Sequence, residues 1–151
     1  MLKHILVPLD GSEVSERALE FARQVVGRDG RITLLTVVDL PEYPTAMFYP
    51  AGIASYDVNV EKMQDQLVPQ ADAYLQKTAD TLRAAGYHVD LTTVIGEPAS
   101  SIVEQADEYN VDAIVMSTHG RSGLSRWLFG SVANKVLSGT RRPILIVPVK
   151  R

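Results

Sequence analysis

The sequence predicts an α/β fold in which five parallel strands form one doubly wound sheet with helices on both faces. Short runs rich in β-branched residues and leucine, typical of strands, alternate with segments of helical spacing; these runs cover residues 4–9, 32–38, 88–95, 111–116 and 143–149. Such alternation favours right-handed crossovers between parallel strands. The length of 151 residues, with 46% hydrophobic and 22% charged residues, is typical of one globular domain, so a single domain over residues 1–151 is expected.

Four helices are predicted between the strands. The first covers residues 12–26, with Ser12 as N-cap and Gly27 as the residue that ends it. The second covers residues 60–85 and ends at Gly86, and Pro69 should kink it. The third begins at Pro98 and ends at residue 110, and the last covers residues 131–139.

The composition of the strands predicts their order in the sheet. The first, second and fourth runs are almost continuously apolar, as expected for central strands covered on both faces. The third alternates polar and apolar residues, and the fifth carries Pro143 and Pro148, which suit an edge. The predicted order is therefore 3-2-1-4-5, with a ligand-binding crevice between strands one and four at their carboxyl ends.

Charge and residue content exclude several classes of protein. The net charge of −3 excludes a strongly basic, nucleic-acid-binding surface, and no run approaches the roughly 20 apolar residues of a membrane span. The chain has no cysteine, and its N-terminus lacks the pattern of a signal peptide. We therefore expect a soluble protein of the cytoplasm that binds neither nucleic acid nor membrane.

Residues 40–59 fit no predicted element. They hold three prolines and four of the nine Tyr and Phe residues of the chain. This loop either packs its aromatic side chains onto the domain or forms a lid beside the crevice, since it leaves the carboxyl end of a strand.

Two stretches carry the candidate site. Asp10 ends the first strand beside a helix N-terminus, where its carboxylate could hold a ribose, bind a cation or cap the helix. Residues 117–131 follow the fourth strand and contain Gly120, Gly123, Gly130, two arginines and several hydroxyls. Glycines before a helix N-terminus let backbone N–H groups approach phosphates, although an ordinary polar loop would also contain them.

Other nucleotide and catalytic motifs do not fit. Ser131 stands where a P-loop needs lysine, and no GxGxxG follows the first strand. A GxSxG nucleophile elbow is missing by one position, at Leu124. The three histidines lie far apart in sequence and have no cysteine to help them, which disfavours a zinc site. No catalytic residue is assigned.

The whole chain resembles the universal stress protein family. The resemblance rests on residues 5–12 (ILVPLDGS), 34–38 (LLTVV), 96–98 (GEP) and 117–131. Members of the family that bind ATP carry Gly, two residues, Gly, nine residues, then Gly followed by Ser or Thr. Gly120, Gly130 and Ser131 match this motif, and Ser117 stands in place of its first glycine. The added side chain would either weaken nucleotide binding or supply one more hydrogen bond.

The resemblance implies ATP or AMP as ligand, with or without Mg²⁺, and a homodimer formed through the last strand. It places the ribose at Asp10, the adenine at Val37 and the phosphates at Gly120, Gly130 and Ser131. The complete set of candidate nucleotide-binding residues is Pro8, Leu9, Asp10, Val37, Ser117, His119, Gly120, Arg121, Gly123, Gly130, Ser131 and Val132.

The predicted function is that of a nucleotide-dependent conformational switch in stress response or signalling. Asp10 and His119 are the only candidates for a general base, so ATP hydrolysis should be slow at most. One alternative is a nucleotide-independent dimeric interaction module of the same fold. Another is an enzyme in which Asp10 holds a metal on ATP.

Overall fold

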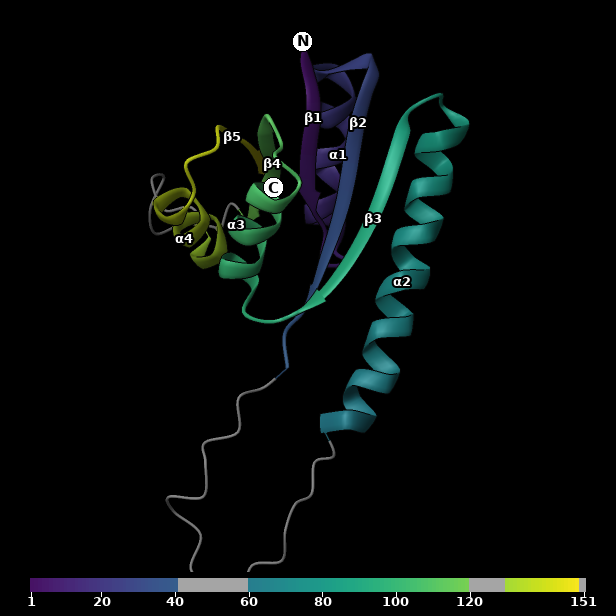
Figure 1. Ribbon diagram of the computed structural model, residues 1–151, viewed down its shortest axis with the longest axis vertical. Helices are drawn as coiled ribbons and strands as arrows, with labels where there is room; N and C mark the ends of the chain where they lie inside the picture. Colours follow the sequence, from purple (N-terminus) through teal and green to yellow (C-terminus); the bar gives the residue numbers. More distant parts are fainter. Residues whose placement is uncertain (41–59, 120–129, 150–151) are drawn as a thin grey trace, which may run out of the picture.

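Strands and helices alternate along the chain as the sequence predicts (Figure 1). The computed structural model describes residues 1–40, 60–119 and 130–149. In chain order, the elements of this part are β1 (Leu2–Pro8), α1 (Glu13–Val25), β2 (Val26–Val38), α2 (Val60–Ala84), β3 (His88–Ile95), α3 (Pro98–Glu108), β4 (Ala113–His119), α4 (Ser131–Gly139) and β5 (Ile144–Val149).

The described strands form one parallel sheet in the order β3-β2-β1-β4-β5, which confirms the predicted topology. The strands predicted to be central are central because their side chains are buried on both faces: Ile5, Leu6 and Val7 of β1 have no exposed surface. β3 and β5 lie at the two edges.

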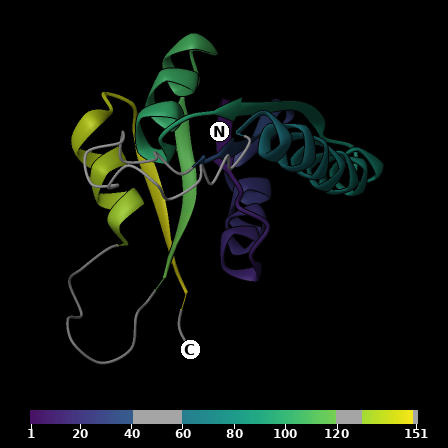
Figure 2. The same cartoon turned by 90° about the horizontal axis from the view of Figure 1, so that it is seen from below.

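Two apolar layers cover the sheet. One cluster joins the sheet to α1 and α2 through residues such as Ala18 and Leu75, and the other joins it to α3 and α4 through Ile102 and Val136. Figure 2 shows α3 and α4 on one side of the sheet and α1 and α2 on the other. No helix in the described part of the chain is both long and apolar enough to cross a membrane.

The first helix ends within one residue of the predicted position, but the second strand begins at Val26 and not at residue 32 as predicted. α1 ends at Val25, and β2 begins at Val26 with no loop between them, so Gly27 lies inside a strand. Val26 has extended backbone, donates its N–H to the carbonyl of Ala22 and is paired with Leu2 of β1. Pairing with β1 therefore replaces the glycine stop.

The other helix boundaries agree more closely with the sequence. Ser12 caps α1 by accepting a hydrogen bond from the backbone N–H of Ser15. α2 continues through Pro69 without interruption and ends before Gly86, whose φ of +95° favours glycine. α3 begins at Pro98 and is followed by Asn110 at a φ of +49°, a conformation that asparagine tolerates.

Candidate functional site

The predicted crevice lies where β1 and β4 stop pairing. Their register covers only Ile5 with Ala113 and Leu6 with Ile114, although β1 continues to Pro8 and β4 to His119. The N–H of Leu9 donates to Leu35 of β2 at 2.7 Å. Because successive backbone groups of a strand point to opposite sides, the nitrogen of Pro8 faces β4, and proline has no N–H to donate. Pro8 therefore ends the β1–β4 ladder at the predicted switch point.

Asp10 lies beyond the end of β1, at the N-terminus of α1. Its Oδ1 accepts hydrogen bonds from the backbone N–H of Ser12 at 2.9 Å and from the hydroxyl of Ser12 at 2.5 Å. Burial raises the pKa of the Asp10 carboxyl, but the bonds from Ser12 and Ser15 outweigh burial and lower it overall. The carboxylate is therefore ionised near neutral pH and held in one orientation on an exposed residue. It could accept a hydrogen bond from a sugar hydroxyl or bind a cation.

The N-terminus of α4 has no side-chain cap. Gly130 is the N-cap residue. Its φ of −55° is accessible to any residue, and a Cβ placed on it would meet no atom within 4 Å. Neither the backbone conformation nor the packing of the described residues requires glycine here. The open space above Gly130 lets an anion approach the free N–H groups of the helix.

Ser117 lies near the carboxyl end of β4, past the last residue pair that β4 makes with β1. Its hydroxyl oxygen is buried and has no hydrogen-bond partner in the described structure. The residue thus places an unsatisfied, buried polar atom beside the predicted switch point.

The remaining candidate residues differ in how far they are buried, and some lie outside the described residues. Val37, near the end of β2, is half-buried, as are Pro8 and Val132, whereas Ser131 is exposed. The side chain of Leu9 belongs to the core, and its N–H and carbonyl are bonded to Leu35 and Thr36. The side chain of His119, the residues Gly120, Arg121 and Gly123, and the aromatic loop from residue 41 to 59 lie outside the described residues.

The sequence interpretation gave no role to Glu97, which caps α3 at the same edge of the sheet. Its carboxylate accepts hydrogen bonds from the N–H of Ala99 at 3.2 Å and from the N–H and hydroxyl of Ser100 at 2.8 and 2.7 Å. These bonds lower the pKa of Glu97 to about 2. Lys135 of α4 lies 3.8 Å from Oε1, which links the starts of α3 and α4. A carboxylate directly before Pro98 was the signal for this cap.

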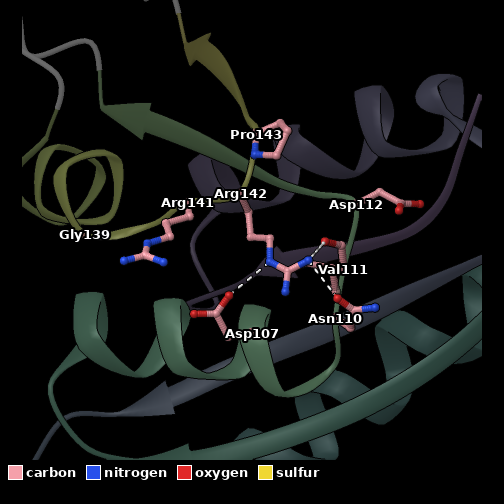
Figure 3. A pocket seen from close by; sticks show the side chains of 8 residues that line it. All are labelled: Asp107, Asn110, Val111, Asp112, Gly139, Arg141, Arg142 and Pro143. Carbon is pink, nitrogen blue, oxygen red and sulfur yellow. Dashed lines mark hydrogen bonds and ion pairs between the residues drawn. The ribbon is translucent and has the colours of Figure 1, made fainter.

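An open pocket of about 620 Å³ lies at the amino ends of the strands, away from the predicted crevice. It is located between the ends of α3 and α4 and the starts of β4 and β5 (Figure 3). Arg142 donates to Asp107 at 3.0 Å, to Asn110 at 2.9 Å and to the carbonyl of Val111 at 3.1 Å. These bonds join the end of α3 to the chain that enters β5. The pocket is therefore built around a structural arginine, away from the predicted crevice.

Metal chemistry has little support in the described part of the chain. Within residues 1–40, 60–119 and 130–149, no three His, Asp or Glu side chains come close enough to form a metal site. At the predicted crevice, Asp10 offers one oriented carboxylate.

Comparison with known proteins identifies the family. The family model for universal stress proteins matches residues 1–148. The chain belongs to the universal stress protein family. Among curated relatives of this universal stress protein, MJ0577 of Methanocaldococcus jannaschii is 30% identical over 157 residues, covering 99% of the chain and 97% of the relative. Universal stress protein A homolog 2 of Coxiella burnetii is 31% identical, with 98% and 96% covered.

Solved structures of universal stress proteins share the fold. The structure of MJ0577 has a TM-score of 0.78 at 29% identity and covers 99% of this chain and 97% of its own. The crystal structure of a universal stress protein in complex with cAMP has a TM-score of 0.64 at 26% identity, with 97% and 96% covered. That relative binds an adenine nucleotide.

Proposed function

We propose that this universal stress protein binds an adenine nucleotide, with ATP as the favoured ligand, at the carboxyl edge of the sheet between β1 and β4. The observation that carries the proposal is the start of α4: a helix N-terminus without a side-chain cap, under a glycine that the described structure does not need. The cAMP complex of a relative supports an adenine nucleotide as the class of ligand.

The residues around the crevice suggest one orientation of the ligand. Asp10 presents an ionised carboxylate at the start of α1, suited to accept hydrogen bonds from the ribose. Gly130 and Ser131 present backbone N–H groups to the phosphates, and half-buried Val37 offers apolar surface to the adenine. Pro8, Leu9, Ser117, His119, Gly120, Arg121, Gly123 and Val132 complete the proposed site.

The proposed role is a nucleotide-dependent conformational switch in the cytoplasm, with hydrolysis that is slow at most. Among the described residues of the predicted site, Asp10 is the only group that could act as a general base. Both hydrogen bonds to its Oδ1 come from Ser12, an arrangement typical of a structural turn. We therefore expect this site to bind the phosphates of the nucleotide without hydrolysing them rapidly. The protein is proposed to act as a homodimer joined through β5.

The first experiment is mass spectrometry of small molecules released from freshly purified, denatured protein, with calorimetric titration of the stripped protein by ATP, AMP and cAMP. Release or binding of an adenine nucleotide supports the proposal. A folded protein that releases none and binds none would favour the nucleotide-independent interaction module.

A substitution at Gly130 tests the site itself. Gly130→Val should lower the affinity for ATP at least tenfold, about 1.4 kcal/mol, because its side chain fills the space above the α4 N-terminus. The fold should be kept, since a Cβ at this position meets nothing within 4 Å. The control is Gly139→Ala at the other end of α4, where a Cβ would make only an ordinary contact with Val103 at 3.5 Å. Unchanged affinity in folded Gly130→Val would remove α4 from the site.

A further inference from the structure

Ser117 has a hydroxyl that the folded protein does not use. The oxygen is buried, and no described residue donates to it or accepts from it. A hydroxyl that loses its hydrogen bonds to water on burial and gains no partner in the protein lowers the stability of the fold. By contrast, the hydroxyl of Thr36, buried near the end of β2, donates to the carbonyl of Leu9 at 3.0 Å. Buried hydroxyls in folded proteins are normally hydrogen-bonded, so the unpaired hydroxyl of Ser117 needs a physical explanation.

The register of the sheet shows on which face this hydroxyl lies. Ser117 is paired with Val147 of β5, which belongs to the core cluster beneath α1 and α2. Val115, two residues earlier on β4, belongs to the same cluster. Because side chains alternate along a strand, Ser117 faces α1, whereas Met116 faces α3 and α4.

The helix α1, beside whose N-terminus Asp10 lies, belongs to the layer that Ser117 faces. The carboxylate of Asp10 is bonded to Ser12, the N-cap of α1. The start of α4, proposed above to hold phosphates, belongs to the opposite layer, because Ala133 packs with α3. The hydroxyl of Ser117 therefore lies on the side of the crevice assigned to the sugar.

We propose that the hydroxyl of Ser117 hydrogen-bonds to a ribose hydroxyl of the bound nucleotide. This rests on the proposed function and adds a sugar-recognising group to that site. In the free protein the hydroxyl is unsatisfied, and rotation about the one Cα–Cβ bond turns it toward the ligand. Ligand binding then supplies the partner that the fold omits, so Ser117 lowers the stability of the free protein and raises its affinity for the nucleotide.

The test is Ser117→Ala, measured both for stability and for binding. The ligand-free variant should melt about 2–4 °C higher than wild type, because a buried, unpaired hydroxyl is removed. Its affinity for ATP should fall roughly three- to tenfold, the value of one neutral hydrogen bond. Opposite signs of the two effects are the signature of a group that is used only in the complex.

Sugar analogues show which atom the hydroxyl meets. Wild type should bind either 2′-deoxy-ATP or 3′-deoxy-ATP less tightly than ATP, and Ser117→Ala should lose most of that difference. The coupling between the serine and one sugar hydroxyl separates direct contact from a general change in the site.

A matched control is Thr36→Val, which removes a paired hydroxyl from β2, on the other side of β1, and should lower the melting temperature. If Ser117→Ala melts higher but binds ATP and both analogues as wild type does, the hydroxyl is only a cost of folding and the inference is wrong. A variant that melts lower would show a partner within the protein and would also overturn it. Failure of wild type to bind ATP at all, seen before any variant is made, overturns the proposed function and the inference together.

Discussion

At the scale of single residues, Pro8 decides where the sheet separates. It is paired with Leu35 of β2 on one side, so β1 continues in the sheet, but it has no N–H to offer β4 on the other. β4 runs on to His119 beside β5 alone. Because proline has no backbone N–H, the part of β4 beyond Ile114 is not paired with β1.

His4 is the residue whose titration should be visible in the stability of the protein. Its Nε2 lies 2.8 Å from the hydroxyl of buried Thr33, and its ring packs edge-on against Tyr109 at 6.4 Å between centroids. Burial lowers the pKa of the imidazole, and the charge of Arg31 lowers it further. Asp90 and Asp112 act in the opposite sense but do not outweigh these effects.

The pH dependence follows from that direction. Because the pKa of His4 is lower in the folded state than the unperturbed value of about 6.5, the unfolded chain binds the proton more readily. The free energy of unfolding should therefore fall as pH drops below about 6.5, until the folded state also takes up the proton. His4→Gln should flatten the stability profile between about pH 7 and pH 5, measured by urea unfolding.

An unchanged slope in His4→Gln would show that His4 does not carry the effect.

At the scale of elements, the unusual feature is the beginning of β2. Leu2 pairs with Val26, but the next register pair is His4 with Arg31, so the chain of β2 makes a bulge between them. Gly30 lies in this bulge. A Cβ there would come within 2.5 Å of Val26 Cγ2 and 3.0 Å of the carbonyl oxygens of Gly27 and Lys3. Two of these neighbours are backbone atoms, which cannot move without disturbing the pairing.

The bulge gives a matched pair of substitutions. Gly30→Ala should lower the free energy of unfolding by about 1–3 kcal/mol, the usual cost of forcing atoms into a packed site. Gly27→Ala should have little effect, because a Cβ at that position makes only ordinary contacts at 3.7 Å or more. Urea unfolding of the two variants measures the difference. Equal stability of the two variants would mean that the bulge accommodates a side chain by shifting.

At the scale of the whole molecule, the sheet has two unequal edges. β3 is flanked by α2, which contacts it over much of its length, and its outward residues include Asp90 and Thr92. β5 has the sequence Ile-Leu-Ile-Val-Pro-Val. Among its residues, Ile146 is half-buried and packs into neither core cluster, which leaves apolar surface on an edge strand. Such an edge is prone to associate unless it is covered.

The proposed dimer therefore places β5 at its interface. Ile146→Lys should convert a dimer into a monomer, because it puts a charge into an apolar contact. Ile95→Lys, at the end of the other edge strand with 46% of its surface exposed, should remain a dimer. Sedimentation at micromolar concentration distinguishes the two, with melting curves to confirm that both variants are folded. A wild-type protein that sediments as a monomer would contradict the proposal.

Much of the fold could be predicted from local patterns. Apolar runs and helical periodicity identified every strand and helix of the described structure, and the contrast between continuous and alternating runs placed β3 and β5 at the edges. The cap at Ser12 and the helix start at Pro98 were also predictable, since the contacts that fix both lie within three residues in the chain. For the site, the sequence pointed to Asp10 and Gly130, whose significance comes from helix starts next to them in the chain.

Element type, element order, caps and apolar faces therefore follow from residues that are close in the chain. The hydrogen-bond partner of each backbone and hydroxyl group depends instead on how distant segments pack together. The early start of β2 depends on pairing of Val26 with Leu2, and the split between β1 and β4 depends on which side of the strand the nitrogen of Pro8 faces. Whether the Ser117 hydroxyl is satisfied depends equally on distant segments. Hydrogen bonds between such segments are set by register and strand direction, which a local pattern does not contain.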